Sequence, residues 1–333
     1  MEHLESDFSI RSDEAEELAL GFKCRGSDAL RHDDVRDRLA SGGYKPRMLA
    51  PETSSACFLA GDCSSAVREL RYNALWAAHA VAVYAIFDGG EHRDMLAGYG
   101  SIPYGSLRYS NYAGLGEIVP YGDVEARSGA ARACFEYESM VKAYRELESE
   151  GLKPDIMLFD GSLYTSRRSL ESAGDQNKEA ALAAKALTEA AGLGRAVGMV
   201  EDSHATDMAH ELGYDFTDLL LIDVALKPGE YVADVREGVS ICYLKLPGKP
   251  LPHLPSGISH PLTVRWEFGY AGYVKDLNLL AGIWLREDDI LHPQLYPLRI
   301  ADHLTRRVRA RGILDEVESR LLLERKYREL REG

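Results

Sequence analysis

The sequence contains no long uninterrupted run of apolar residues, although 45% of its 333 residues are hydrophobic. A membrane-spanning helix needs about 20 apolar residues in succession, so none is expected. The first residues, from Met1 to Asp7, are acidic and lack the basic and apolar regions of a secretory signal peptide. We therefore expect a cytoplasmic protein that does not associate with membranes and is large enough for one large domain or two smaller ones.

Cysteine is scarce as well. The chain has 5 cysteines, which is an odd number, and no two of them are spaced as C-x-x-C. This pattern argues against a disulfide framework and against a zinc knuckle. We expect Cys57 and Cys134 to be small residues of the core, which is the usual fate of an unpaired cysteine.

An excess of positive charge is also lacking, because 39 basic residues face 53 acidic ones and the net charge is −14. The field of the whole chain therefore repels nucleic acids. Any site for a polyanion must be local and must depend on metal ions or clustered arginines. The candidate clusters are the arginine-rich tract 306–311 and the pair Arg167 and Arg168, although either could simply be a solvated surface.

The pattern of apolar, glycine and proline residues predicts alternating strands and helices in the centre of the chain. Three strands come first, then a helix, a strand, a helix and a strand: 56–62, 74–87, 95–102, 125–149, 155–160, 175–191 and 195–200. Later strands are expected at 219–224, 239–246 and 262–268, and a tyrosine-rich loop at 103–123.

This order predicts an α/β fold of the ribonuclease H-like type. The first three strands form an antiparallel meander, and the strands separated by helices pair in parallel, which gives a mixed sheet flanked by helices. We expect an N-terminal arm at 1–50, a main domain at 51–312 and a C-terminal helix at 313–333.

Two aspartates each follow a short apolar run and precede a small residue and a serine. They are Asp62, before Cys63 and Ser64, and Asp160, before Gly161 and Ser162. A carboxylate at the end of a buried strand lies at the rim of the sheet, where backbone geometry holds it and solvent reaches it. Mg²⁺ and Mn²⁺ prefer such carboxylate oxygens. The two motifs therefore predict one divalent-metal site, although each alone is also an ordinary turn.

The helix at 125–149 is expected to supply a third carboxylate. Glu138 is preferred because it flanks the apolar face marked by Cys134 and Val141, and Glu136 is held in reserve. A later helix that starts near Pro297 carries a histidine, His303, which could bind metal, position water or act as an acid or base.

The chemistry that fits these groups is phosphodiester hydrolysis with two metal ions about 4 Å apart. In such a site the serines Ser64 and Ser162 could position a carboxylate or a phosphate. Arg167 and Arg168 follow the second aspartate closely and are expected to contact nucleic acid.

Taken together, the two aspartate motifs, the helix with glutamates and the late segment from Tyr296 to His303 resemble the NurA family of nucleases. The resemblance extends over residues 56–310. It implies a ribonuclease H-like core, a homodimer around a DNA channel, dependence on Mn²⁺ or Mg²⁺, and a HerA-type hexameric translocase as partner. It also implies single-strand endonuclease and 5′→3′ exonuclease activity in the processing of DNA ends. The metal-binding acids of the family would fall on Asp62, Glu138 (or Glu136) and Asp160, and its C-terminal tyrosine and histidine on Tyr296 and His303.

The chain departs from the family pattern at two places. Cys63 stands where a glycine is usual, and Glu201 and Asp202 stand where many relatives carry a lysine. These differences motivate an alternative function, a catalytically weak dimeric adaptor that docks on the translocase and guides DNA. A phosphotransferase of the actin and sugar-kinase type shares the core topology, but the sequence has neither a duplicated core nor a phosphate-binding P-loop.

Overall fold

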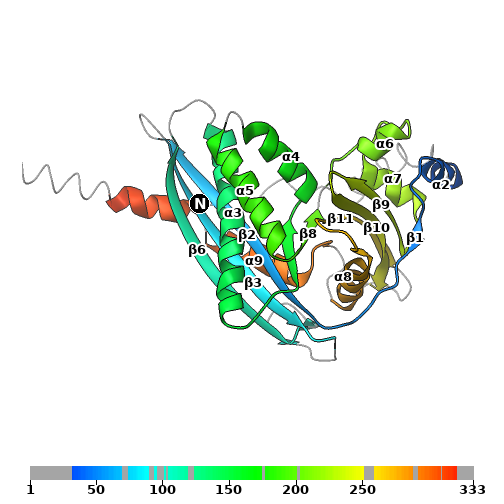
Figure 1. The fold of residues 1–333 in the computed structure, drawn as a ribbon, viewed down its shortest axis with the longest axis horizontal. Helices are drawn as coiled ribbons and strands as arrows, with labels where there is room; N and C mark the ends of the chain where they lie inside the picture. Colours follow the sequence, from blue (N-terminus) through cyan, green and yellow to red (C-terminus); the bar gives the residue numbers. More distant parts are fainter. Residues whose placement is uncertain are drawn as a thin grey trace, which may run out of the picture.

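The structure is a computed structural model that describes residues 32–69, 74–89, 94–95, 101–102, 104–118, 124–174, 177–200, 203–250, 259–287, 292–308 and 310–320. Within these ranges the main element is a mixed sheet of nine strands in the order β1-β9-β10-β11-β8-β7-β2-β3-β6 (Figure 1). The strands of this sheet are β1 (Arg47–Met48), β2 (Ala56–Glu69), β3 (Ala74–Phe87), β6 (Ser106–Ile118), β7 (Ile156–Asp160), β8 (Arg195–Val200), β9 (Glu230–Arg236), β10 (Val239–Pro250) and β11 (Ser259–Phe268).

The part of the sheet that runs β6-β3-β2-β7-β8 has the predicted topology. β3 pairs antiparallel with both β2 and β6, whereas β7 pairs parallel with both β2 and β8. An antiparallel meander followed by parallel strands joined through helices confirms the ribonuclease H-like mixed sheet.

The third strand of the meander is β6, and the prediction of a loop at 103–123 is wrong for residues 106–118. Of the predicted strand at 95–102, the described residues pair in a separate two-stranded antiparallel sheet of β4 (Asp94–Met95) and β5 (Ser101–Ile102). Glycines suggested a loop, but Gly114 and Gly116 lie against aromatic rings. A Cβ on Gly114 would be 2.6 Å from the Phe135 ring, and one on Gly116 would be 2.3 Å from Trp76.

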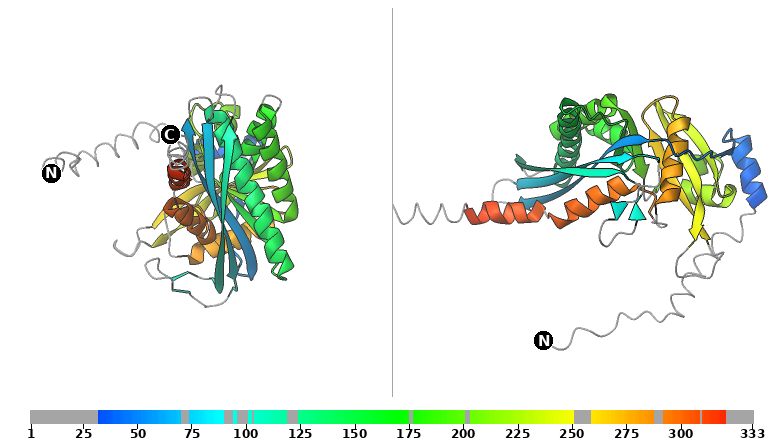
Figure 2. Two further views of the ribbon diagram at one scale, coloured as in Figure 1. Left: turned by 90° about the vertical axis from the view of Figure 1, so that its left-hand side faces the viewer. Right: turned by 90° about the horizontal axis from the view of Figure 1, so that it is seen from below.

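Helices cover both faces of the sheet, so that the sheet is the middle of three layers (Figure 2). Successive strand residues point to opposite faces. Leu59 and Phe159 therefore pack with α3 and α5 on one face, while Phe58 and Leu158 pack with α8 and α9 on the other. The helices are α2 (His32–Ser41), α3 (Val124–Ser149), α4 (Leu163–Gly174), α5 (Lys178–Leu193), α6 (Asp207–Glu211), α7 (Asp218–Ala225), α8 (Val274–Arg286) and α9 (Tyr296–Arg307).

The described part of the predicted N-terminal arm is packed onto the sheet. Val35 and Leu39 of α2 are buried in a cluster with α7, and Arg36 pairs with Glu230 of β9 at 2.6 Å. β1 adds an edge strand next to β9. Residues 32–50 are therefore an integral part of the fold, and residues 1–31 lie outside the described residues.

Residues 219–224 form helix α7, so the prediction of a strand there is wrong. Thr217 caps the helix by accepting a hydrogen bond from the backbone of Leu220, and Leu221, Ile222 and Ala225 are buried. These three positions have helical spacing. A short, almost wholly apolar run such as 219–224 does not by its pattern alone distinguish a strand from a buried helix.

At the C-terminal end a helix over residues 310–320 follows α9. It contacts the far end of β2, because Arg68 pairs with Asp315 at 2.6 Å and with Glu318 at 2.8 Å. The rest of the predicted C-terminal helix lies outside the described residues. Among the helices in the described ranges, none has the length and apolar character to cross a membrane.

Candidate active site

The two aspartates predicted from the sequence lie next to each other on neighbouring strands. The parallel ladder between β2 and β7 ends with the pair Gly61 and Phe159, and Asp62 and Asp160 are the next residues on each strand. Adjacent strands are about 4.8 Å apart. The alternation of side chains directs both aspartates to the face that α9 covers. β7 ends at Asp160, whereas β2 continues to Glu69, so the site lies where the two strands part.

Each aspartate accepts a hydrogen bond from the region of α9. The Thr305 hydroxyl donates to Asp62, whose residue surface is only 6% exposed. Gln294, which precedes the helix, donates from Nε2 to Asp160 Oδ1 at 2.6 Å. Asp160 is exposed to solvent. The site thus has one buried and one accessible carboxylate.

Glu136 of α3 supplies a third carboxylate next to these two. Its burial raises its pKa to about 8, because desolvation disfavours the charged form; Arg132 opposes this shift, and the nearby charges of Asp62 and Asp160 reinforce it. The close crossing of helix and strand explains the placement. A Cβ on Gly61 would lie 2.1 Å from Met140 Sδ, so the glycine makes room for the Met140 side chain of α3 against β2. Glu136 is one turn before Met140 and reaches the level of the aspartates.

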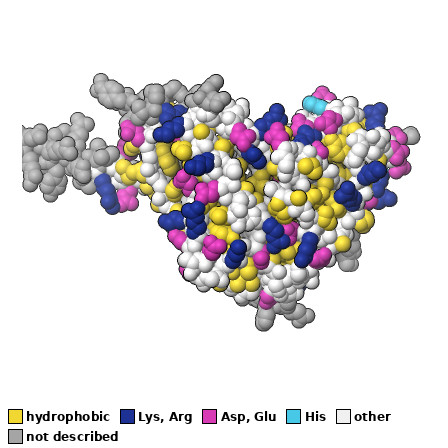
Figure 3. Space-filling model, in the orientation of Figure 1, with side chains coloured by type: hydrophobic (Ala, Val, Ile, Leu, Met, Phe, Trp, Pro, Cys, Tyr) yellow, Lys and Arg dark blue, Asp and Glu magenta, His cyan; other side chains and the backbone are white. Residues whose placement is uncertain are grey.

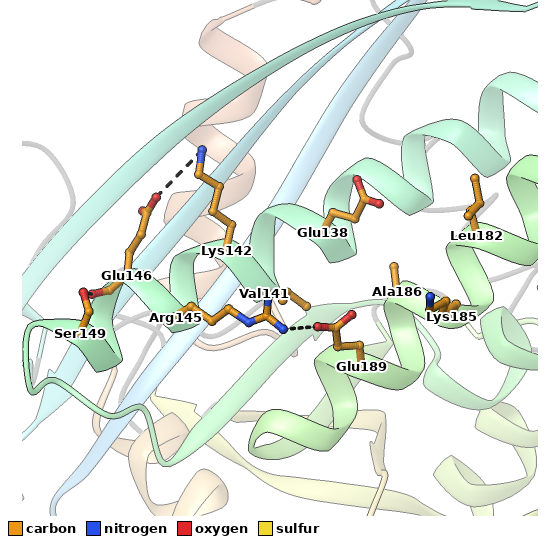
Figure 4. Close-up of a pocket in the computed structure, with 10 residues that line it drawn as sticks. All are labelled: Glu138, Val141, Lys142, Arg145, Glu146, Ser149, Leu182, Lys185, Ala186 and Glu189. Carbon is orange, nitrogen blue, oxygen red and sulfur yellow. Dashed lines mark hydrogen bonds and ion pairs between the residues drawn. The ribbon is translucent and has the colours of Figure 1, made fainter.

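Glu138, the glutamate preferred from the sequence, lies elsewhere. It is exposed and lines a groove of about 540 Å³ between α3 and α5 (Figure 4). Two residues along a helix correspond to a rotation of about 200°, so Glu136 and Glu138 cannot share a face. The structure therefore corrects the sequence preference and places the reserve candidate, Glu136, beside the aspartates.

Arg132 lies between two of the acids. Its Nε donates to the carbonyl of Cys63 at 2.8 Å, and its Nη2 is 3.8 Å from both Asp62 Oδ1 and Glu136 Oε2. In the described part of the chain, no three Asp, Glu, His or Cys side chains already converge on a common metal position. Three neighbouring carboxylates nevertheless form the hard oxygen donor set that suits Mg²⁺ or Mn²⁺.

The serine after Asp160 has a structural partner. Ser162 Oγ donates to Glu267, with distances of 2.8 and 3.0 Å to its two carboxylate oxygens, and accepts from the backbone of Thr165 at the start of α4. Glu267 is fully buried and pairs with Arg265 at 2.6 Å. This geometry gives Ser162 a capping role and does not favour the predicted contact with phosphate.

The other predicted contacts to nucleic acid are at the surface or near α9. Ser64 is two residues beyond Asp62 on β2 and therefore on the same face of the sheet. Its Oγ donates to the carbonyl of Thr305 at 3.4 Å. On α4, Arg167 pairs with Glu171 at 2.9 Å, and Arg168 donates to the Tyr164 hydroxyl at 3.2 Å.

Tyr296 and His303 are both on α9, which begins at Tyr296 with proline in its first turn, as predicted. Tyr296 is 3% exposed, and its backbone NH donates to Glu287 at 2.9 Å. It therefore belongs to the core beneath the site. His303 is half-buried. It lies two residues before Thr305, or about 200° away around the helix, and so on a different side from the hydroxyl that contacts Asp62.

The sequence profile of the NurA domain family matches residues 58–307, a span that contains all three acids. This match covers well over half of the chain. The chain belongs to the NurA family.

Solved structures of other NurA proteins share this fold. The NurA nuclease from Sulfolobus solfataricus is 14% identical, with a TM-score of 0.58 over 95% of this chain and 98% of that one. A NurA structure with manganese is 13% identical, with a TM-score of 0.52 over 93% and 98% of the two chains. A NurA structure with dAMP and manganese is 11% identical, with a TM-score of 0.50 over 88% and 93%. No sequence among the curated proteins matches significantly.

Three residues of this NurA site were missed by sequence reasoning: Arg132, Gln294 and Thr305. The spacing of Arg132 and Glu136, four residues apart on a predicted helix, was a usable signal, because such pairs lie on one helix face. Gln294 and Thr305 carry no comparable signal, since their contacts depend on how α9 crosses the sheet.

Proposed function

We propose that this NurA protein is a metal-dependent DNA nuclease that hydrolyses phosphodiesters with two divalent ions, Mn²⁺ or Mg²⁺. The observation that supports this most directly is the register of β2 and β7, which aligns Asp62 with Asp160 where α3 adds Glu136. A solved relative with bound dAMP and manganese is consistent with such a site.

The residues of this chain would act by binding the metal ions and by orienting the carboxylates that bind them. Asp62, Glu136 and Asp160 would bind the ions and offset their charge, while Thr305 and Gln294 fix the two aspartates from the α9 side. Bound divalent ions supply an activated water and stabilise the leaving oxygen in this class of reaction. The exposure of Asp160 gives the substrate a side from which to approach.

DNA would meet the protein at local basic groups. On the face shown in Figure 3, basic and acidic side chains are intermingled, and the net charge is −14. Binding would therefore depend on the metal ions and on nearby arginines. Arg167 and Arg168 remain candidates for this contact, as does Ser64, which is two residues from Asp62 on the same face of β2.

Family membership motivates the finer assignments. We propose single-strand endonuclease and 5′→3′ exonuclease activity in DNA end resection during repair, as a homodimer with a HerA-type hexameric translocase. Tyr296 and His303 remain predicted participants. Their substitution to Phe and Ala tests whether they affect turnover or only the packing of α9.

The test of the nuclease function is Mn²⁺-dependent cleavage of single-stranded DNA by the purified protein. Asp62→Asn, Glu136→Gln and Asp160→Asn should each abolish cleavage while the far-ultraviolet circular dichroism spectrum is retained. Glu138→Gln is the matched control on the same helix and should cleave normally. Equal cleavage by wild type and Asp160→Asn would discard the mechanism.

The adaptor function is favoured by one observation, the arginine between the acids, because a guanidinium there opposes cation binding. An adaptor would co-purify with the translocase and show no metal-dependent cleavage at any Mn²⁺ concentration. Cleavage that requires Asp160 would exclude it.

A further inference from the structure

Arg132 differs from the other arginines that contact buried carboxylates. Arg299 pairs with Glu287 at 2.6 Å, and Arg265 pairs with Glu267 at the same distance. The Arg132 guanidinium instead lies 3.8 Å from an oxygen of each of two acids, Asp62 and Glu136. It is shared between them without a close hydrogen bond to either.

The close bond that anchors Arg132 is made to the backbone. Its Nε donates to the Cys63 carbonyl at 2.8 Å. β7 has ended at this level, so among the described residues no strand on that side continues the ladder for the β2 backbone. The end of β7 therefore opens the position at which the guanidinium sits.

When both are ionised, as metal binding requires, two neighbouring carboxylates with little exposure repel each other strongly, and a positive charge beside them stabilises that state. Asp62 is 6% exposed and Glu136 is 8% exposed. The Arg132 side chain is 45% exposed, so it can leave the site toward solvent without crossing the core.

We propose that Arg132 is the resident cation of the metal-free site and that a divalent ion displaces it on entry. This inference rests on the proposed metal-dependent function. A divalent ion such as Mg²⁺ binds oxygen ligands at about 2.0–2.1 Å, and a guanidinium close to both carboxylates would then face an ion of like charge. Arg132 is thus a positioning residue that holds Asp62 and Glu136 together and sets how strongly the site binds metal.

Removal of the arginine should tighten metal binding. An opposite charge within about 4–6 Å shifts the proton affinity of a carboxylate by about 1–3 units, which is 10- to 1000-fold. Because Arg132 is nearly half exposed, solvent screens its charge, and we expect a change in metal affinity at the lower end of this range, about tenfold. Removal of the positive charge of Arg132 favours the binding of a divalent ion about twice as strongly as the binding of a proton. The affinity for the metal should therefore still increase when a proton competes at one of the carboxylates.

The experiment is calorimetric titration of the metal-free full chain with Mn²⁺ at one pH and ionic strength. Arg132→Gln should bind Mn²⁺ about tenfold more tightly than wild type, and Arg132→Lys, which keeps the charge, should remain within a few-fold of it. Arg145→Gln is the matched control, since Arg145 is on the same helix and pairs with Glu189 of α5. It should bind Mn²⁺ as wild type does. Arg132→Met keeps the apolar stem and replaces Arg132→Gln if that variant does not fold.

A second readout separates this role from a purely structural one. If Arg132 is the resident cation, Arg132→Gln should lower the melting temperature in EDTA and lose most of that deficit in saturating Mn²⁺. An equal deficit in both conditions, or Mn²⁺ binding no tighter than in wild type, overturns the proposal.

Failure of the proposed function has a different signature. If Asp62→Asn and Asp160→Asn bind Mn²⁺ as tightly as wild type, the ions bind elsewhere and both proposals fall. If those two variants no longer bind Mn²⁺ but Arg132→Gln binds it no more tightly than wild type, only the role of Arg132 is refuted.

Discussion

The raised pKa of Glu136 has a measurable consequence for stability. Burial moves this pKa from an ordinary value of 4.5 to about 8. A carboxyl whose pKa is raised on folding contributes stability that is fully present below its unfolded value and lost as the pH rises through its folded value. The metal-free protein should therefore become less stable between about pH 6 and pH 9, because Glu136 must ionise in a buried site next to two aspartates.

The size of this loss follows from the two pKa values. With one unit of pKa equal to about 1.4 kcal/mol, the contribution of Glu136 falls by about 2–3 kcal/mol between pH 6 and pH 9 and is nearly zero at pH 9. Glu136→Gln has no proton to lose. Its free energy of unfolding should stay higher than that of wild type at pH 9 by a margin that is absent or reversed at pH 6.

The assay is urea denaturation in EDTA at pH 6, 7, 8 and 9, for wild type, Glu136→Gln and the exposed control Glu138→Gln. Subtracting the free energies of unfolding of two variants at each pH removes the effect of the acidic surface on stability, which all three proteins share. Saturating Mg²⁺ should restore the stability of wild type at pH 9, since the ions require the ionised carboxylate. Parallel pH profiles for wild type and Glu136→Gln would show that Glu136 does not ionise in this pH range at a cost in stability.

Three further substitutions test the packing around the site by urea denaturation. Glu267→Gln should cost about 3–5 kcal/mol, because it leaves the buried Arg265 without a carboxylate partner; a loss below 1 kcal/mol would mean that the pair is solvated. Gly61→Ala should cost about 1–3 kcal/mol by forcing its new methyl group against Met140, and wild-type stability would show that the Met140 side chain moves aside without cost. Ser162→Ala should cost about 1 kcal/mol through the lost helix cap while the affinity for single-stranded DNA is unchanged; a marked fall in affinity would restore the predicted phosphate contact.

The aspartates of the site could be predicted because their signal is local. An apolar run that ends in an acid predicts a strand end and a rim position, and the sheet then brings two such ends together. The register of β2 and β7 agrees with that expectation for Asp62 and Asp160. β2 itself continues well past Asp62, so the aspartate marks the end of the parallel ladder and not the end of the strand.

The choice between the two glutamates could not be made in the same way. It depends on how α3 is rotated about its axis, and in the observed rotation Met140 packs against Gly61. The sequence shows an apolar face but not which of its borders meets the aspartates. The same reason hides Arg132, because its partners are a strand carbonyl and acids that are distant in the sequence.

The tyrosine-rich segment was mistaken for a loop because its glycines outweighed its alternating pattern. In β6 those glycines make room for the rings of Phe135 and Trp76. Contacts of this kind come from other parts of the chain, so local propensity cannot reveal them.

The central claim is that Asp62, Glu136 and Asp160 share divalent ions. The most direct test is an anomalous-scattering map of crystals soaked in Mn²⁺. We expect manganese peaks within about 2.0–2.4 Å of oxygens of all three side chains, with the Arg132 guanidinium moved away from them. Manganese bound by Glu138, or no peak between Asp62 and Asp160 at saturating Mn²⁺, would contradict it.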